Sequence, residues 1–338
     1  MSNLQADGIN ARIPKEQMSE DIRRWWDAYE IVPGAPIYRK EFGFYCMEEW
    51  LKQGLDPDVD HAELFNYHKN AKHSLGNIGW CEAAFLPVFE TKLIEDRGDC
   101  EVEQDFAGRH VLYFKGKRSG FMPEYLVHPV KDIKTWEEDV KWRMNPDSLE
   151  RYVDLDQRMV EAKIAAGEGK MICCNLIGGY MYLRSLIGPE DLLYKFYDSP
   201  ELIHECMQTW LKLADAVTAK HQKHVTIDEI FFGEDICYNH GPLISPDMMN
   251  EFIIPYYQQY ISNVRARQID KNRHIYIQID TDGFADPTIP VYQKGIKMDV
   301  MSPFEVASNC DVIRTGKEFP ELVIHGGIDK RILAQGKK

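Results

Sequence analysis

The second half of the chain alternates short apolar runs with longer segments of helical character. The stretch "IYIQIDTDG" shows the strand pattern clearly, because Ile275, Ile277 and Ile279 fall on one face of a strand that ends in polar residues. Comparable runs recur at intervals of roughly 25 to 55 residues, with helical patterns between them. This alternation predicts a parallel sheet with crossover helices. The expected strands lie near Ile37, Glu82, Met171, Ile227, Ile275, Met298 and Leu322.

Two regions depart from this rhythm. Residues 1–33 form an N-terminal extension in which "RRWWDAYEI" predicts a helix. Residues 89–128 alternate apolar and polar positions, with turn signals at Arg97-Gly98-Asp99 and Ala107-Gly108. This pattern predicts an antiparallel hairpin insertion that projects from the main body. After it, "DIKTWEEDVKWRM" predicts a helix with Asp132 as its cap.

The predicted parallel strands share polar residues at their carboxyl ends. Neither a GxGxxG turn after a strand nor a GxxxxGK[ST] loop is present, which argues against an open nucleotide-binding sheet. Polar groups from several strand ends are instead typical of a TIM-type (β/α)8 barrel, whose site lies at that face. We therefore predict one barrel domain over 1–338. The polar strand ends are Asn175, Glu234-Asp235, Asp280-Thr281-Asp282, Ser302 with Glu305, and His325 with Asp329.

The barrel expected from the sequence has one strand too few. Seven strands can be assigned, and an eighth strand and helix would normally follow "HGGIDKRILA", where the tail "QGKK" supplies neither. We expect either that the eighth strand is missing from this chain or that the barrel is completed in an unusual way.

Composition and charge narrow the class of protein. Of the 338 residues, 44% are hydrophobic and 28% charged, as in a globular protein, and the formal charge of −14 argues against nucleic acid or an anionic membrane as the main partner. The N-terminus lacks the apolar core of a signal peptide, and no apolar run reaches about 18 residues, so a cytoplasmic location is expected. The eight scattered cysteines are expected to be reduced thiols.

Four motifs resemble the C-terminal segments of the uroporphyrinogen decarboxylase superfamily. They are "FFGEDICYNHGPLISPDMMNEFIIPYY", "IDTDGFADPTIPVYQKGI", "MSPFEVASNCDV" and "IHGGIDKRILA". The resemblance implies a TIM-type barrel, often dimeric, with its site at the C-terminal mouth. True uroporphyrinogen decarboxylases carry an RQAGRY loop, whereas "PIYRKEFGFYCMEEW" here offers only Arg39 and Lys40. Decarboxylation of a porphyrinogen is therefore not expected.

A second branch of the superfamily contains corrinoid-dependent methyltransferases that bind zinc. Its thiol-methylating members carry an HxCG motif, and "DTDG" here places Asp280 and Asp282 at its two ligand positions. Methyltransferases that act on aryl methyl ethers resemble this chain more closely, because Asp282 and Cys310 reproduce the aspartate-to-cysteine spacing associated with them. Their third ligand would fall near position ~350, beyond Lys338.

The resulting hypothesis is a zinc-dependent methyltransferase with a corrinoid protein as partner. Glu234, Asp282 and Cys310 are the candidate zinc ligands, since zinc accepts carboxylate oxygen and thiolate sulfur and a catalytic site keeps one position open. The metal would polarise the oxygen of an aryl methyl ether, and the cobalt(I) of the corrinoid would take the methyl group.

Other roles are open for the same residues. Asp282 could cap the following helix, Cys310 could pack inward, and Glu234 could act as an acid or base without a metal. A metal-free lyase (a decarboxylase) and a catalytically inactive binding protein are therefore the alternative functions. The further candidates are Asp280, Tyr238 and His325 for catalysis, and Asn175, Tyr180, Arg184, Asp235 and His240 for substrate binding, with Tyr180, Tyr182 and Arg184 alternatively packing the barrel top.

Overall fold

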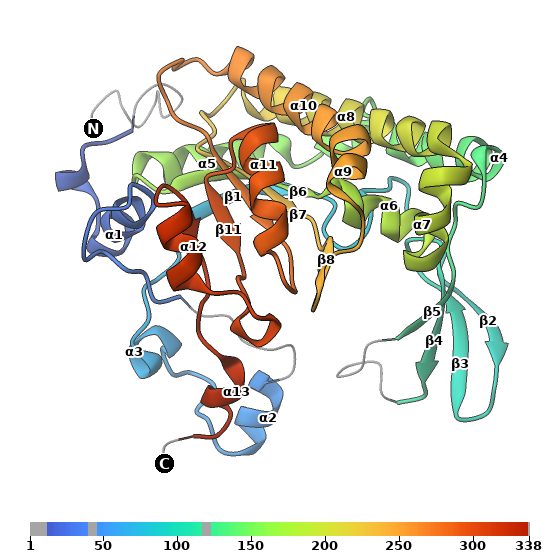
Figure 1. The fold of residues 1–338 in the computed structure, drawn as a ribbon, viewed down its shortest axis with the longest axis horizontal. Coiled ribbons are helices and arrows are strands. Elements are labelled where there is room, and N and C mark those ends of the chain that lie inside the picture. The colour runs from blue at the N-terminus through green and yellow to red at the C-terminus, as the bar shows by residue number, and fades with distance from the viewer. Residues whose placement is uncertain (1–11, 40–45, 117–122, 337–338) are drawn as a thin grey trace.

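A six-stranded parallel sheet forms the centre of the molecule (Figure 1). The computed structural model describes residues 12–39, 46–116 and 123–336. The spatial order of the strands in this sheet is the same as their order along the chain, as in a barrel. Within these ranges, however, the sheet has two open edges, at β1 and β12. The strands in spatial order are β1 (Lys72–Ile78), β6 (Met171–Ile177), β7 (Glu229–Gly233), β10 (Tyr276–Asp280), β11 (Val300–Ser302) and β12 (Val323–Ile324).

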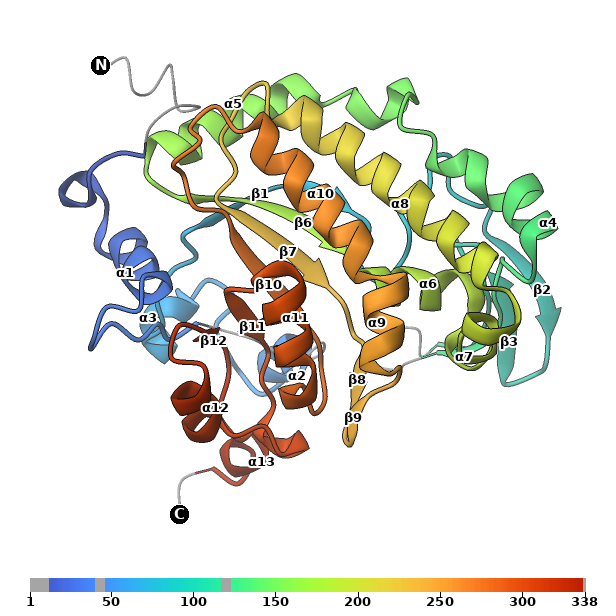
Figure 2. The same cartoon turned by 45° about the horizontal axis from the view of Figure 1, so that its top comes forward.

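Helices cover one face of this sheet, and α8 and α10 run side by side along it (Figure 2). No helix in the described ranges is both long enough and apolar enough to cross a membrane. The helices are α1 (Glu20–Tyr29), α2 (Cys46–Lys52), α3 (His61–Phe65), α4 (Ile133–Thr135), α5 (Leu155–Gly167), α6 (Gly179–Ile187), α7 (Pro189–Asp198), α8 (Pro200–His221), α9 (Pro246–Phe252), α10 (Ile254–Arg267), α11 (Ile289–Ile296), α12 (Val312–Glu318) and α13 (Lys330–Leu333).

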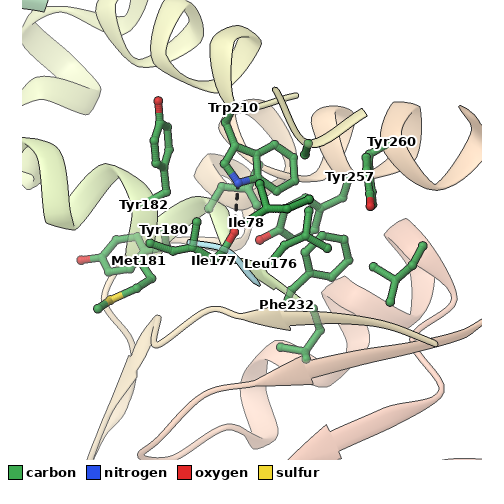
Figure 3. Packing of buried hydrophobic residues seen from close by; sticks show 14 of the residues in the cluster. Ile78, Leu176, Ile177, Tyr180, Met181, Tyr182, Trp210, Phe232, Tyr257 and Tyr260 are labelled. Atoms are coloured by element: carbon green, nitrogen blue, oxygen red, sulfur yellow. Dashed lines mark hydrogen bonds between the residues drawn. The ribbon is translucent and has the colours of Figure 1, made fainter. Parts of the chain in front are cut away.

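The main core lies between the sheet and the helices on the side of α8 and α10. Strand β6 is buried over nearly its whole length, as expected for a parallel strand covered on both faces. On the helix side, Trp210 of α8 donates from Nε1 to the carbonyl of Ile177 at 2.9 Å, and Phe232 stacks on Tyr257 of α10 at 4.1 Å between ring centroids (Figure 3). These contacts fix the helix layer against the carboxyl half of the strands.

Helix α1 packs on the opposite face of the sheet and forms a second, smaller core. Its apolar residues Ile22, Trp25, Trp26 and Tyr29 repeat at helical spacing, so they form one buried face. Ser19 caps the helix by accepting from the backbone N–H of Ile22 at 3.4 Å. This face packs against sheet residues that alternate with those of the main core, namely Met171, Cys173, Val300 and Val323. The predicted N-terminal helix is confirmed, and residues 1–11 of the extension lie outside the described ranges.

A separate four-stranded antiparallel sheet projects from the body (Figure 1). It falls within 89–128, so the predicted hairpin insertion is confirmed. Its strands are β2 (Lys92–Asp96), β3 (Cys100–Gln104), β4 (His110–Phe114) and β5 (Glu124–Val127), and a short hairpin elsewhere contains β8 (Cys237–Tyr238) and β9 (Gly241–Pro242).

Three sequence-based expectations need correction. Residues 35–39 form no strand, and the strand expected near Glu82 lies earlier, at β1. The helix expected after Asp132 starts as predicted, with a capping box to Thr135, but continues as a π-helical turn and then a 3-10 turn (Lys141–Met144). The structure shows the parallel α/β architecture, and closure of the sheet into an eight-stranded barrel stays a prediction.

Candidate functional site at the carboxyl ends of the strands

The carboxyl ends of β7, β10 and β11 lie level with one another. Asp280 pairs in register with Gly233 on one side and with Ser302 on the other. Side chains two residues apart point to the same face of a strand, so Gln278 and Asp280 share the α1 face of the sheet with Glu229 and Phe231. The acidic strand ends predicted from the sequence therefore gather at one edge.

Asp282 is the unusual carboxyl group at this edge. The residue is exposed, yet its side chain forms no hydrogen bond or ion pair within the described part of the chain. Partial loss of solvent around the carboxyl group raises its pKa to about 6, and the charges of Asp235, Glu305 and Asp280 add to this while Lys330 opposes it. Asp282 does not cap the next helix, because α11 begins without a side-chain cap, so the capping interpretation was wrong.

The other carboxylates of the edge have cationic or hydroxyl partners. Arg184 of α6 pairs with Asp235, and Lys330 of α13 pairs with Glu305, which also accepts from the backbone N–H of Gly283 at 2.9 Å. Asp280 accepts from the hydroxyl of Ser302. Asp235 has a φ of 48°, a left-handed conformation that is uncommon for aspartate and that recurs at functional sites.

Glu234 points away from this edge, although it neighbours Asp235 in sequence. Its carboxyl group is fully buried at the start of α6, where it accepts from the backbone N–H of Tyr180 at 3.0 Å and from the hydroxyl of Tyr257. Burial raises the pKa of Glu234 to about 7, against the effect of these donors. Its contacts connect β7 to α6 and α10, so Glu234 has a structural role in holding these elements together.

This placement predicts a pH-dependent effect of the substitution Glu234→Gln. A carboxyl group whose pKa is raised on folding stabilises the protein below its unfolded pKa, near 4.5, and loses that contribution as the pH rises through about 7. Glutamine keeps the shape and does not ionise. The stability of the variant relative to the wild type should therefore increase from pH 5 to pH 8 by on the order of 2 kcal/mol. Urea unfolding at both pH values measures this, and a difference independent of pH would contradict it.

The three predicted zinc ligands do not converge. Glu234 is enclosed between β7, α6 and α10, Asp282 lies at the exposed edge, and the buried Cys310 thiol donates to the carbonyl of Gly283 at 3.4 Å. Burial also raises the pKa of Cys310, which disfavours the thiolate that zinc requires. In the ranges that the structure describes, no group of three or more His, Cys, Asp or Glu side chains is placed to hold a metal ion. These residues do not fit a zinc ion.

The remaining predicted residues divide between the edge and the core. Tyr238 and His240 are exposed on the β8–β9 hairpin, which contacts the segment after β10 through the carbonyl of Tyr238 and the N–H of Phe284. Asn175 is half-buried in β6, in register with Phe231. Tyr180 and Tyr182 are fully buried, so these two rings pack the core rather than line an open aromatic pocket.

His325 lies on the α1 side of the sheet, against the ring of Tyr29 at 5.6 Å between centroids. Burial lowers the pKa of His325 well below its usual value, and the nearby cations Lys72 and Arg39 lower it further. The imidazole is therefore neutral near pH 7, and a role as an imidazolium acid is not supported.

An aromatic pair at the edge was missed by the sequence analysis. Trp80 follows β1, is 49% exposed, and stacks on Phe231 with ring centroids 5.6 Å apart and planes at 10°. Its ring lies over Gly233, the register partner of Asp280. An exposed indole next to strand-end carboxylates offers a flat apolar surface to a ligand. The sequence analysis expected this strand near Glu82, which would put Trp80 before the strand. Because β1 ends at Ile78, Trp80 instead follows the strand and lies at its carboxyl end.

Comparisons with known proteins give information on the fold alone. No protein-family model and no curated protein matches the chain. Among solved structures, the chain is similar to a methyltransferase from Methanosarcina mazei, with a TM-score of 0.51 and 13% sequence identity over 88% of this chain and 79% of that chain. At this identity the similarity concerns the fold, and membership of the uroporphyrinogen decarboxylase superfamily stays a prediction.

Proposed function

We propose that the chain is a methyltransferase that takes a methyl group from a small donor bound at the carboxyl ends of β7, β10 and β11. The observation that carries this proposal is the carboxyl group of Asp282, which is unpaired among the described residues and has a pKa of about 6. Such a group is partly protonated near neutral pH and can act as a general acid. Support for the class of reaction comes from the fold shared with a methyltransferase and from the sequence resemblance.

An aryl methyl ether is the donor we propose. Its ring would stack on the exposed face of Trp80, which lies above Gly233. Asp282 would then face the ether oxygen from the neighbouring strand end. Because a neutral ether carries no charge, the surrounding carboxylates do not repel it.

The chemistry assigned to this chain is the activation of the leaving group. The bond between the methyl carbon and the ether oxygen breaks, its electron pair stays on the oxygen, and Asp282 supplies the proton that makes the product a neutral phenol. The methyl acceptor would be the cobalt(I) corrinoid of a partner protein, as the sequence resemblance predicts. Holding donor and acceptor in line is the task of the edge residues.

The test is methyl transfer to free cob(I)alamin under anaerobic conditions. We expect the purified protein with a methoxybenzene donor to convert cob(I)alamin to methylcobalamin, seen by its absorbance, and to release one phenol per methyl group. Denatured protein is the control. Failure with a panel of aryl methyl ethers, together with carbon dioxide release from aromatic carboxylic acids, would reject methyl transfer in favour of the lyase alternative.

A further inference from the structure

A groove of about 250 Å³ lies between α10 and the end of α11, which pack against each other in the helix layer (Figure 2). The two helices approach closely, because a Cβ atom added at Gly295 would lie only 2.8 Å from Cγ2 of Ile254. One wall of the groove is a single stripe of α10, since its lining residues recur three and four positions apart. This stripe consists of Gln258, Ile261, Ser262 and Arg265.

Three cationic side chains line this groove. Arg265 comes from α10, Lys294 from α11, and Lys297 is the residue at which α11 ends. All three are exposed, and their side chains form no ion pair or hydrogen bond within the described ranges. No acidic side chain is among the described residues that line the groove. In a chain with a formal charge of −14, such a local excess of positive charge favours an anionic ligand.

A neighbouring arginine shows the contrast with a structural role. Arg267, two residues further along α10, is half-buried and donates to Oδ1 of Asp215 at 2.7 Å and to Oε1 of Gln222 at 2.9 Å. These bonds tie the end of α10 to α8. Arg265 has no such partner in the described part of the chain, so its guanidinium group is available to a ligand.

The two lysines are not used to cap α11. Basic side chains near the end of a helix often bond to its last carbonyl groups. Here the carbonyl of Gly295 accepts from Nε2 of Gln258 at 2.8 Å, and that of Gln293 accepts from the backbone N–H of Lys297 at 3.1 Å. Lys297 has a φ of 54°, a left-handed conformation in which glycine is the usual residue. The backbone alone would favour glycine at this position, so lysine adds a charge at the cost of some strain.

The shape and polarity of the groove indicate the class of anion. At about 30 Å³ for each water molecule, it has room for roughly eight water-sized groups, about twice what one phosphate occupies. Arginine and lysine bind phosphate oxygens through charge-assisted hydrogen bonds, and the exposed hydroxyl of Ser262 adds a further donor. The buried side chains of Ile261 and Ile296 supply an apolar part that suits an organic group.

We propose that this groove binds the diphosphate group of a small organic diphosphate, with Arg265, Lys294 and Lys297 contacting the phosphate oxygens. None of the lining residues belongs to the carboxyl edge of the sheet, so the site does not depend on the proposed methyl transfer. Binding is therefore measured without turnover, and its failure would leave the proposed function untouched.

The experiment is calorimetric titration of the full chain with inorganic pyrophosphate at pH 7.5 and low salt, without divalent cations. We expect one site per chain, with an affinity that decreases as salt is added, because the contacts lie at the surface. Replacing Arg265, Lys294 and Lys297 together by glutamine should abolish binding. Lys297→Gly should raise the Kd about 10-fold and leave the protein folded, since glycine adopts the left-handed backbone without strain. Lys297→Arg should retain most of the affinity.

Two controls identify the site and the ligand. Lys317→Gln removes another exposed cation of the described chain that has no ion pair there, on α12, and should leave the Kd unchanged. ADP, which joins a diphosphate to an organic group, should displace pyrophosphate, and AMP should do so about 10-fold more weakly. The proposal is overturned if pyrophosphate does not bind, if the triple variant or Lys297→Gly binds it as well as the wild type, or if Lys317→Gln weakens binding equally. Binding of pyrophosphate that ADP cannot displace would reject an organic diphosphate.

Discussion

The substitution Lys72→Met is expected to lower the free energy of unfolding by about 3–5 kcal/mol. The Lys72 side chain is 15% exposed and that of Glu229 only 1%, so the variant leaves a carboxylate buried without its cation. The Tyr29 hydroxyl and the amide of Gln278 cannot replace the lost charge. Urea unfolding at pH 7.5, followed by circular dichroism, measures the difference.

Two controls separate this burial effect from a generic loss of charge. Lys72→Met combined with Glu229→Gln removes both charges, and most of the lost stability should return. Lys52→Met breaks an ion pair with Glu49 in which both side chains are more than half exposed, so it should leave the free energy of unfolding nearly unchanged. A Lys72 variant as mild as the Lys52 variant would show that the buried pair does not matter to stability.

Much of the fold could be predicted from the sequence, because local pattern determines it. The buried parallel strands from Met171 onward are continuous apolar runs separated by amphipathic helices, and each appears where expected. The first strand was misplaced, since β1, with the sequence "KHSLGNI", contains too few consecutive apolar residues to stand out. Whether a sheet closes into a barrel depends on long-range pairing, which no local pattern reports.

The sequence predicted that these polar residues gather, but not how each side chain is oriented. Polar strand ends indicated one edge of the sheet, and Asp280, Asp282, Asp235 and Arg184 lie there. The zinc hypothesis depended on Glu234 facing the same way as Asp282. Two adjacent residues at a strand end point to opposite sides, and the sequence does not say which of Glu234 and Asp235 turns toward the helices. The structure assigns that position to Glu234, whose contacts with Tyr180 and Tyr257 hold it there.

The substitution Asp282→Asn is expected to lower the rate of methyl transfer at least about 100-fold, the usual contribution of a general acid. In the wild type the rate should fall as the pH rises through about 6, since only the protonated carboxyl group can donate. Asparagine has no such proton, so the variant should show no step near this pH. Initial rates with cob(I)alamin between pH 5 and pH 8 measure both effects.

A series of aryl methyl ethers with different ring substituents tests whether Asp282 acts as a proton donor. Electron-withdrawing substituents on the ring stabilise a departing phenolate, so such donors need less help from an acid. The loss caused by Asp282→Asn should therefore shrink as the pKa of the product phenol decreases. An equal loss for all donors would point to a binding role for Asp282 instead of proton donation.

A measurement of stability is the control that shows whether the Asp282→Asn variant is folded. The pKa of Asp282 is raised on folding, so its carboxyl group favours the folded state below about pH 4 and loses that contribution as the pH rises through about 6. Asp282→Asn should then be more stable than the wild type at pH 7.5, by about 1 kcal/mol once solvent screening is allowed for, and the gain should vanish toward pH 4. Asp247→Asn, at an exposed aspartate in α9, should change neither activity nor stability. If Asp282→Asn is both less active and less stable than the wild type, the acid role is contradicted. If the variant is inactive but more stable, the result supports a carboxyl group that is retained for catalysis at a cost in stability.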